Sequence, residues 1–238
     1  MQIAGATSRG KIREQNEDAF WYNDSCAVVC DGMGGHQAGE IASQIAVHTV
    51  AGHSFLWDDP QDEIVQVIQS AHERILAEAE RNNGYHGMGT TMTLIAFPNA
   101  ADPSEAYLGH VGDSRAYLWR AGRLQQLTTD HSVAQELVRS GALDPTEVDS
   151  HPQRNMLTQA LGAGIVQVET AALTLQLNDG ILLCSDGLTA ALDEKAIASL
   201  LEQTGSVSAL AESMVDAADQ AGGPDNTTVI VIRIGSPD

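Results

Sequence analysis

The stretch ILLCSDGLT, at residues 181–189, shows the two features that decide the fold. A short apolar run, typical of a buried strand, leads directly into Ser-Asp-Gly. An earlier stretch, AVVCDGMGG at residues 27–35, has nearly the same layout, with its own aspartate after an apolar run. A carboxylate at the end of a buried strand is poorly solvated. Each aspartate therefore either begins a turn or faces a cation, and these two stretches alone leave both possibilities open.

Length and composition predict one globular domain with a sizeable core. The chain has 238 residues, of which 43% are hydrophobic and 18% are charged. Acidic residues outnumber basic ones 32 to 12, which gives a formal net charge of -20. Nucleic acids and anionic membranes need a basic surface, so we expect neither as a partner. The acidity indicates either solubility or carboxylates that bind cations.

The three cysteines, Cys26, Cys30 and Cys184, lie in or beside apolar runs. Their number is odd, and their spacing matches neither a disulfide framework nor a zinc site. Buried free thiols are typical of a reducing compartment. The first residues lack the apolar segment of a signal peptide, and no apolar run approaches the ~20 residues that span a membrane. We therefore expect a monomeric, cytoplasmic protein.

Turn signals and apolar periodicity predict an α+β domain. Helical spacing predicts a helix from residue 38, a second after the Asp59 cap and Pro60, and two more after residue 185. Asn178-Asp179-Gly180 predicts a hairpin between the strands on either side. Because short turns join most strands, the sheets should be antiparallel, with the helices packed outside. The predicted strands are residues 2–6, 19–22, 25–30, 91–97, 106–111, 115–119, 124–127, 166–175, 181–184 and 227–234.

Four aspartates stand next to strands and beside glycine or another turn residue, and a fifth, Asp18, precedes a strand. The four are Asp31, Asp113, Asp186 and Asp225. Carboxylate oxygens are the ligands that Mg²⁺ and Mn²⁺ prefer. Asp-Gly is also a common turn, and periodicity does not show whether the aspartates meet.

Two further residues have chemistry that suits a phosphate. Arg13 lies in RGKIREQNED, and a guanidinium can grip a phosphate with a bidentate fork. The alternative for Arg13 is a surface salt bridge to Glu14 or Glu17, which contributes little to stability. His36 follows Gly-Met-Gly-Gly and could protonate a leaving group, or it could simply begin a helix.

Taken together and in order, these stretches resemble the metal-dependent Ser/Thr protein phosphatases of type 2C, in their compact bacterial form. The resemblance implies a four-layer α-β-β-α sandwich, in which two antiparallel sheets are flanked by helix pairs and metals lie in a cleft at one edge. It also implies one catalytic domain over residues 1–238, with a mobile flap at about residues 131–161. The motifs that carry the resemblance are RxxNED (13–18), DGMGGHxxGE (31–40), GTT (89–91), HVGDSRAY (110–117), TxDHS (128–132), LTQALG (157–162), LLCSDGL (182–188) and GGPDNTTVIVI (222–232).

The resemblance implies a set of metal ligands. Asp31, Asp186 and Asp225 would bind one Mn²⁺ or Mg²⁺ ion. Asp31 would bridge to a second ion, which also takes the backbone carbonyl of Gly32. Asp113, together with Asp186, would form a weaker third metal site.

The resemblance also implies roles around the metals. Asp18 would count among the metal residues, and both Asp18 and Glu17 would hold metal-bound waters, with Asn226 behind them. Arg13 would hold the substrate phosphate. Either His36 or a water would protonate the leaving group.

The implied reaction is hydrolysis of phosphoserine and phosphothreonine in proteins by a hydroxide that bridges two divalent metals. Phosphorylated proteins are then the expected partners. The alternative is a catalytically silent, phosphoprotein-binding relative, and such relatives normally lack one or more of the metal aspartates. A two-metal nuclease is a third possibility, against which the charge of -20 argues.

Overall fold

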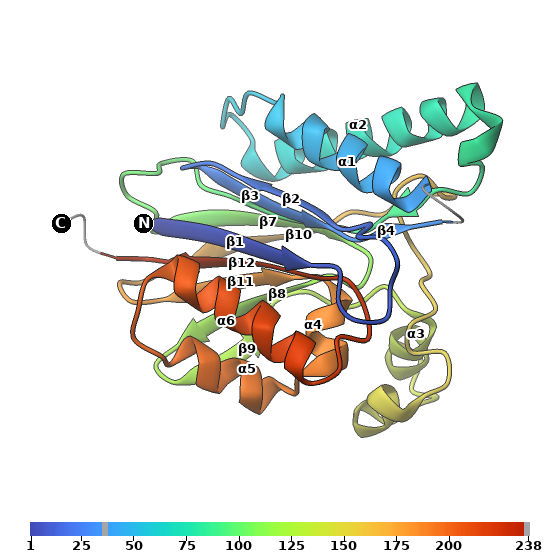
Figure 1. Ribbon diagram of the computed structural model, residues 1–238. Helices are drawn as coiled ribbons and strands as arrows, with labels where there is room; N and C mark the ends of the chain where they lie inside the picture. The colour runs from blue at the N-terminus through green and yellow to red at the C-terminus, as the bar shows by residue number, and fades with distance from the viewer. Residues whose placement is uncertain (35–37, 236–238) are drawn as a thin grey trace.

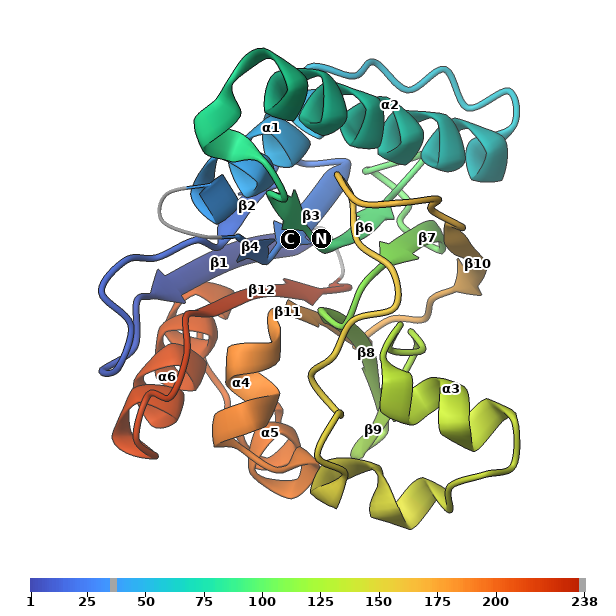
Figure 2. The same ribbon diagram turned by 90° about the vertical axis from the view of Figure 1, so that its right-hand side faces the viewer.

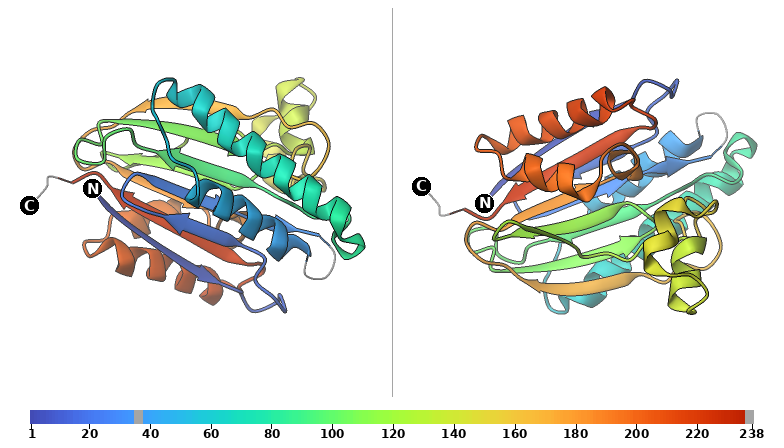
Figure 3. Two further views of the ribbon diagram at one scale, coloured as in Figure 1. Left: turned by 90° about the horizontal axis from the view of Figure 1, so that it is seen from above. Right: turned by 90° about the horizontal axis from the view of Figure 1, so that it is seen from below.

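Two antiparallel sheets packed face to face form the centre of the molecule, and helices cover both outer faces (Figure 1). The structure is a computed structural model that describes residues 1–34 and 38–235. The four layers can be followed from above and from below in Figure 3. The α+β sandwich implied by the resemblance is therefore confirmed.

Each large sheet has five strands, and every pairing is antiparallel. The first sheet runs in the order β1 (Gln2–Ser8), β12 (Thr227–Arg233), β11 (Gly180–Cys184), β8 (Arg115–Arg120) and β9 (Arg123–Gln126). The second runs β10 (Glu169–Thr174), β7 (Glu105–Val111), β6 (Met92–Ala96), β3 (Cys26–Cys30) and β2 (Ala19–Tyr22). A small two-stranded sheet pairs β4 (Gly32–Met33) with β5 (Gly89–Thr90).

Helices pack on the outer face of each large sheet. On the β10–β2 sheet these are α1 (Ala38–Ala51) and α2 (Pro60–Arg81), which the short η1 (Asn83–Tyr85) follows. On the β1–β9 sheet they are α4 (Asp186–Ala191), α5 (Glu194–Leu201) and α6 (Val207–Gln220). Across residues 1–34 and 38–235, no helix has both the length and the apolarity to cross a membrane.

The flap, residues 131–161, lies at the end of the sandwich away from the chain termini (Figures 1 and 2). It contains α3 (Val133–Arg139) and the 3₁₀ helix η2 (Pro145–Ser150), which contact each other. Its remaining residues are turns and extended chain. Whether this segment moves as a separate unit stays a prediction.

The strands β3 and β11 explain the two apolar runs that resemble each other. Every residue of both strands is buried, because each strand is covered by the other sheet on one face and by helices on the other. A strand buried on both faces reads as a continuous apolar run rather than as an alternating one. The runs are therefore rigid supports for the aspartates that follow them.

The long helix α2 forms as the sequence predicts. The Asp59 side chain accepts the Asp62 N–H at 3.2 Å, and Pro60 occupies the first helical position. The stripe that includes Ile64 and Ile68 is fully buried. A Cβ at Gly109 of β7 would lie 2.7 Å from Ile68 Cδ1, so the glycine lets the helix pack closely on the sheet.

The predicted hairpin at Asn178-Asp179-Gly180 is wrong. Strand β10 pairs with β7 in one sheet, whereas β11 pairs with β8 and β12 in the other. Asn178 does adopt a left-handed turn conformation, with φ of 71°. Its N–H donates to Ile234 O at 2.7 Å, and Asp179 O accepts the Ile234 N–H at 2.9 Å. The turn is thus bound to the end of β12, and the chain crosses between the sheets.

Candidate active site

The predicted metal aspartates gather at one end of the sandwich, where β3, β7 and β11 end and β2, β8 and β12 begin. Asp31 and Asp186 follow the central strands β3 and β11, one from each sheet. Asp18 and Asp225 stand before β2 and β12, and Asp113 lies in the turn between β7 and β8. The charges of Asp18, Asp186 and Asp113 help to raise the pKa of Asp31, and the charge of Asp225 helps to raise that of Asp186. The structure therefore brings all five carboxylates together.

The backbone around Asp31 is held by two adjacent threonines. Asp31 N–H donates to Thr91 Oγ1 at 2.9 Å. The Asp31 carbonyl accepts the Thr90 hydroxyl at 2.8 Å and the Thr91 N–H at 2.9 Å. With the main chain fixed in this way, the carboxylate has only its own side-chain torsions left to adjust.

Gly32 and Glu17 are packed against each other and against the start of α1. Gly32 N–H donates to Glu17 O at 3.2 Å, and the Ser43 hydroxyl donates to the same oxygen at 2.6 Å. A Cβ at Gly32 would collide with the backbone oxygens of Glu17 and Gly39, so only glycine fits. Glu17 Oε1 is buried without a hydrogen-bond partner among the residues described, and burial raises the pKa of this carboxyl.

Asp18 is tied to the opposite sheet through Ser185. The Ser185 hydroxyl donates to Asp18 Oδ2 at 2.7 Å and accepts the Thr228 N–H at 2.9 Å. Asp18 Oδ1 is buried and has no partner within residues 1–34 and 38–235. A buried carboxylate oxygen of this kind is costly unless a cation or a bound water meets it.

The carboxylates repel one another. Burial, followed by the charges of neighbouring aspartates, raises the pKa of Asp18 to about 7 and that of Asp113 to about 8. The same two causes raise the pKa of Asp31 well above its usual range, and burial raises that of Asp186. A side-chain contact with Asp186 adds to the rise in the pKa of Asp31. Such a set of hard oxygen ligands fits divalent Mn²⁺ or Mg²⁺, which would replace the missing positive charge.

Arg13 lies at the rim of this cluster. Its Nη2 donates to Asp225 Oδ2 at 2.6 Å, and 53% of its side chain is exposed. A surface pocket of about 770 Å³ lies beside it, lined in part by Arg13, Glu17 and Asn226. The salt bridges to Glu14 or Glu17 that the sequence left open are absent from the ion pairs among the described residues.

Asn226 positions the loop that carries Arg13. Its Oδ1 accepts the Glu17 N–H at 2.9 Å. Its Nδ2 donates to Arg9 O at 2.9 Å and to Gln15 O at 2.8 Å. All the polar atoms of this buried amide are thus used to shape the loop. His36, the other residue predicted to act on the substrate, lies outside the described residues.

Two histidines, His110 and His131, form a cluster with Glu169 next to the Asp113 turn. The possible ligand atoms of the three residues lie within 4.8 Å of one another. Thr93 donates its hydroxyl hydrogen to Ser114 O, so its Oγ1 must accept from His110 Nδ1 at 2.9 Å. His131 Nδ1 accepts the Gly112 N–H at 3.1 Å, which places the His131 proton on Nε2. With a proton on that nitrogen, this cluster is not prepared to bind a metal.

Sequence reasoning missed three sets of residues that shape the site. Ser185 orients Asp18, and the Thr90-Thr91 pair holds Asp31. The Arg115–Asp130 ion pair lies beside Asp113. Each lies in one of the motifs that carry the resemblance, and all but Asp130 are polar residues at or next to a strand end, as the aspartates are. A polar residue at the end of a strand was therefore the sequence signal that could have identified most of these residues.

The chain matches the family model described as Protein phosphatase 2C over residues 8–220. The chain belongs to the protein phosphatase 2C family. It is 36% identical to the serine/threonine phosphatase stp of Listeria welshimeri, over 95% of this chain and 93% of that protein. It is also 36% identical to the serine/threonine protein phosphatase PstP of Mycobacterium tuberculosis, over 98% of this chain and 45% of that longer protein.

Solved structures of this family superpose closely on the chain. The crystal structure of the Mycobacterium tuberculosis phosphatase PstP/Ppp gives a TM-score of 0.92 at 35% identity, covering 98% of both chains. The PstP catalytic domain in complex with two manganese ions gives a TM-score of 0.86 at 33% identity, covering 97% of this chain and 96% of that one. Membership of this protein phosphatase 2C family makes the chain a metal-dependent protein phosphatase.

Proposed function

We propose that this protein phosphatase hydrolyses phosphoserine and phosphothreonine in other proteins, with Mn²⁺ or Mg²⁺ ions held by Asp31, Asp186 and Asp225. The observation that carries the proposal is the convergence of carboxylates from both sheets, whose pKa values burial and mutual repulsion raise. When bound, divalent cations acidify water and offset the charge of the transferred phosphoryl group. The phosphatase with two manganese ions supports this choice of cofactor.

The surrounding residues have orienting roles in this proposal. Only glycine fits at position 32, because a Cβ there would collide with the backbone. We assign the Gly32 carbonyl to the second cation. Asp18 and Glu17 each have a buried oxygen without a partner among the described residues, which suits hydrogen bonds to water around the cations. Asp113, paired with Asp186, is our choice for a third and weaker cation.

Arg13 is assigned to the phosphate of the substrate. It is half-exposed at the rim of the acidic cluster, and its bond to Asp225 uses one of its five N–H donors. The remaining donors can form a bidentate contact with phosphate oxygens. Asn226 holds the loop that carries Arg13, so it positions the guanidinium without touching the substrate.

The departing serine or threonine oxygen needs a proton, which either His36 or a water supplies. The His36→Gln variant separates the two possibilities. If His36 is the acid, the variant loses the decline of the rate at high pH and is slowed by about 10²-fold or more. If water is the acid, the shape of the pH–rate profile is kept.

The test of the proposed function is turnover of a phosphothreonine peptide with Mn²⁺, with Mg²⁺ and with EDTA. We expect turnover only with metal, and its loss in Asp186→Ala. The matched control is Asp216→Ala, which removes an exposed aspartate of α6. Turnover that survives EDTA would overturn the metal mechanism. Tight phosphopeptide binding without turnover under every metal would instead support the catalytically silent alternative.

We further propose that the protein works as a monomer in the cytoplasm and binds neither nucleic acid nor membranes. The net charge of -20 disfavours polyanionic partners, and the three cysteines are buried free thiols, which suit a reducing compartment. Light scattering after size exclusion tests the monomer. A dimer mass at micromolar concentration would contradict it.

A further inference from the structure

The loop that carries Arg13 gathers basic charge at the rim of the acidic cluster. Arg9, Lys11 and Arg13 are three of the 12 basic residues in a chain whose net charge is -20. Arg9 and Lys11 are exposed, and neither forms an ion pair within the part of the chain that the structure describes. Arg9 Nη1 donates to the Glu14 carbonyl at 3.1 Å, a neutral acceptor that leaves its charge uncompensated. We call residues 9–15 the rim loop, and Figure 2 shows it in blue, protruding past the end of β1.

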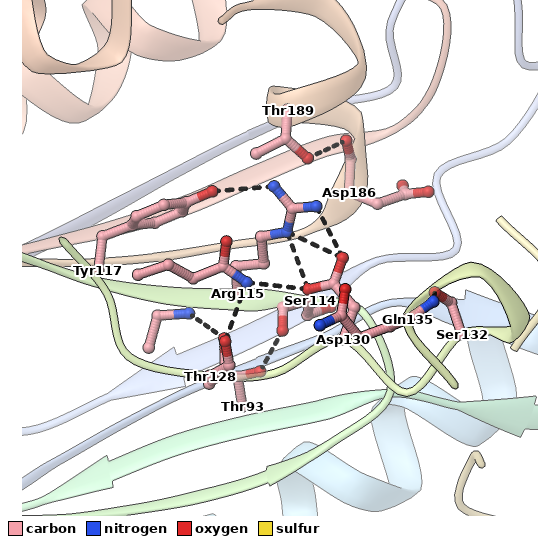
Figure 4. Close-up of polar contacts among 12 residues, drawn as sticks. Thr93, Ser114, Arg115, Tyr117, Thr128, Asp130, Ser132, Gln135, Asp186 and Thr189 are labelled. Atoms are coloured by element: carbon pink, nitrogen blue, oxygen red, sulfur yellow. Dashed lines mark hydrogen bonds and ion pairs between the residues drawn. The ribbon is translucent and has the colours of Figure 1, made fainter. Parts of the chain in front are cut away.

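The arginines at the two ends of β8 are, in contrast, paired within the chain. Arg115 donates three hydrogen bonds of 2.7 to 3.1 Å to Asp130, and Figure 4 shows its guanidinium between Asp130 and Tyr117. Arg120 holds both oxygens of Asp179. The charge of a guanidinium in such a fork is compensated by its carboxylate. The exposed cations of the rim loop can instead be met by an anion from solution.

Ile12 adds an apolar surface between two of these cations. It stands between Lys11 and Arg13, and 71% of it is exposed. A single exposed apolar residue is normal on a protein surface. Ile12 differs in its place, because it lies one residue from the arginine assigned to the substrate phosphate. A substrate side chain that covered Ile12 would gain from the apolar area removed from water.

The rim loop is held in one shape by its contacts with the rest of the chain. Gly10 has a left-handed backbone, with φ of 73°, and a Cβ at this position would collide with Asp225 O. The next residue, Lys11, donates its N–H to Gly223 O at 2.9 Å. Asn226 Nδ2 donates to the carbonyls at both ends of the loop. A loop fixed in this way loses little conformational entropy when it binds a ligand.

The surface charge changes sign across Arg13. Glu14 and Glu17 line the pocket of about 770 Å³ beside Arg13, whereas residues 9–12 do not line it. The field of distant acidic residues is screened within about 8 Å at physiological salt, so nearby charges dominate at the rim. A peptide whose phosphate is bound by Arg13 would therefore meet cations and Ile12 on one side and carboxylates on the other.

We propose that Lys11 and Ile12 are specificity-determining residues, which select substrates with an acidic and an apolar residue on one side of the phosphorylated residue. Arg9 adds a second cation to the same surface. Lys11 is two positions from Arg13, and an extended chain spans about 3.3–3.6 Å per residue, so the favoured residues should lie within about three positions of the phosphorylated residue. This proposal rests on the proposed function and names the substrate class of that site.

The first test compares phosphothreonine peptides of equal length, turned over with Mn²⁺. A neutral parent is matched with one peptide that has a pair of glutamates before the phosphothreonine and one that has the pair after it. We expect one glutamate peptide to exceed the parent by about threefold to tenfold in kcat/KM, through a lower KM, and the other to fall below it. The gain should vanish in about 1 M NaCl. If neither glutamate peptide exceeded the parent, or if both did so equally, the proposal would be wrong.

Lys11→Glu tests the charge. The favoured glutamate peptide should fall below the parent in this variant, and Lys11→Gln, which only removes the charge, should give an intermediate ratio. Because Lys11 is exposed, both variants should fold, which thermal unfolding checks.

The matched control is Arg123→Glu, which changes the net charge equally at an exposed position of β9, opposite Arg120. It should keep the wild-type ratio of the glutamate peptide to the parent. Equal changes in Lys11→Glu and Arg123→Glu would attribute the preference to net charge and overturn the proposal.

Ile12→Ser tests the apolar contact. In wild type, a leucine on the favoured side should raise kcat/KM by about threefold to tenfold relative to serine at the same place. Ile12→Ser should lose most of this gain. Leu56→Ser is the matched control, since Leu56 is 77% exposed in the segment between α1 and α2 and does not line the pocket beside Arg13. A leucine preference retained in folded Ile12→Ser, or lost equally in both variants, would overturn the role of Ile12.

The same measurements separate this proposal from the proposed function. If wild type turned over none of the peptides with Mn²⁺, the proposed function would fail, and the substrate class with it. If wild type turned over every peptide with the same kcat/KM, the proposed function would stand and only the substrate class would fail.

Discussion

The two ends of the β-sandwich both contain poorly exposed aspartates, but at one end an arginine pairs with the aspartate, and at the other the aspartates cluster together. At the end near the termini, Asp179 is 2% exposed, and Arg120 grips both of its oxygens. At the flap end, Asp18, Asp31 and Asp186 lie together, and burial raises the pKa of each. The first end is electrostatically complete within the chain. The second is complete only when cations from solution join it, which is what distinguishes a structural ion pair from a binding site.

The largest effect should come from removing an aspartate at the flap end, which should abolish turnover while making the metal-free protein more stable. We expect Asp186→Ala to lose at least about a thousandfold in turnover, because a proposed ligand of the cations is gone. In EDTA the same variant should be more stable than wild type, because one of several repelling carboxylates has been removed. Phosphopeptide turnover and urea unfolding in EDTA measure the two effects.

The corresponding change at the end near the termini is Asp179→Ala. Asp179→Ala should keep wild-type turnover but lose about 1–2 kcal/mol in the free energy of unfolding, because the Gln176 N–H and Arg120 lose their acceptor. The same two assays apply. If Asp186→Ala were destabilised in EDTA as Asp179→Ala is, the contrast between the two ends would be broken.

Ser185 offers a sharper test, because it contacts Asp18 without being a proposed ligand. Ser185→Ala removes the hydrogen bond to Asp18 Oδ2 and leaves the Thr228 N–H without its acceptor. We expect about tenfold weaker Mn²⁺ binding and a loss of about 1–3 kcal/mol in stability. Ser206→Ala, which removes the cap of α6, should cost about 1 kcal/mol with metal binding unchanged. Equal effects on metal binding would contradict the role of Ser185.

The stability of the metal-free protein should fall as pH rises from about 6.5 to 8. The folded-state pKa values of Asp18 and Asp113, about 7 and about 8, lie above those of the unfolded chain. The folded protein therefore binds more protons in this window, and raising the pH removes about 1–2 kcal/mol of stability. Below pH 6.5, His110, whose pKa burial lowers to about 4, acts in the opposite direction.

Thermal unfolding in EDTA across pH 6.5–8 measures this loss, and saturating Mn²⁺ should remove it. Asp113→Asn is the control, since it should reduce the slope near pH 8. A stability that is flat or rising across the window in EDTA would show that the carboxylates are neutralised from within the chain.

The sequence predicted the clustered aspartates of the site better than it predicted the contacts that hold them in place. Asp31, Asp186 and Asp225 could be found because each interrupts a pattern beside a buried strand, and the ordered motifs implied the sandwich. The hairpin at Asn178-Asp179-Gly180 failed because local turn chemistry does not specify the partner of the next strand. That partner is decided by long-range pairing with β12.

The supporting contacts were out of reach for a related reason. Arg115 and Asp130 are 15 residues apart, and Asp18 and Ser185 are 167 apart. No periodicity relates such positions. Arg115 and Asp130 meet beyond the paired residues of the β8–β9 hairpin, and the contact of Asp18 with Ser185 depends on how the two sheets are stacked. The carboxylates identify themselves by residue type, whereas a serine or an arginine gains its role only from the neighbour that folding provides.

The smallest effect is expected at the cysteines that make the two apolar runs alike. Cys30 and Cys184 are fully buried, and burial raises the pKa of Cys184 to about 12, so neither thiol ionises near neutral pH. We expect Cys30→Ala and Cys184→Ala each to cost about 1 kcal/mol through a small cavity, with turnover within about twofold of wild type. A large fall in kcat with an unchanged Tm would instead place a thiol in the chemistry. Because each cysteine lies within two residues of a proposed metal ligand, this pair of variants tests whether the strand ends act only as supports for Asp31 and Asp186.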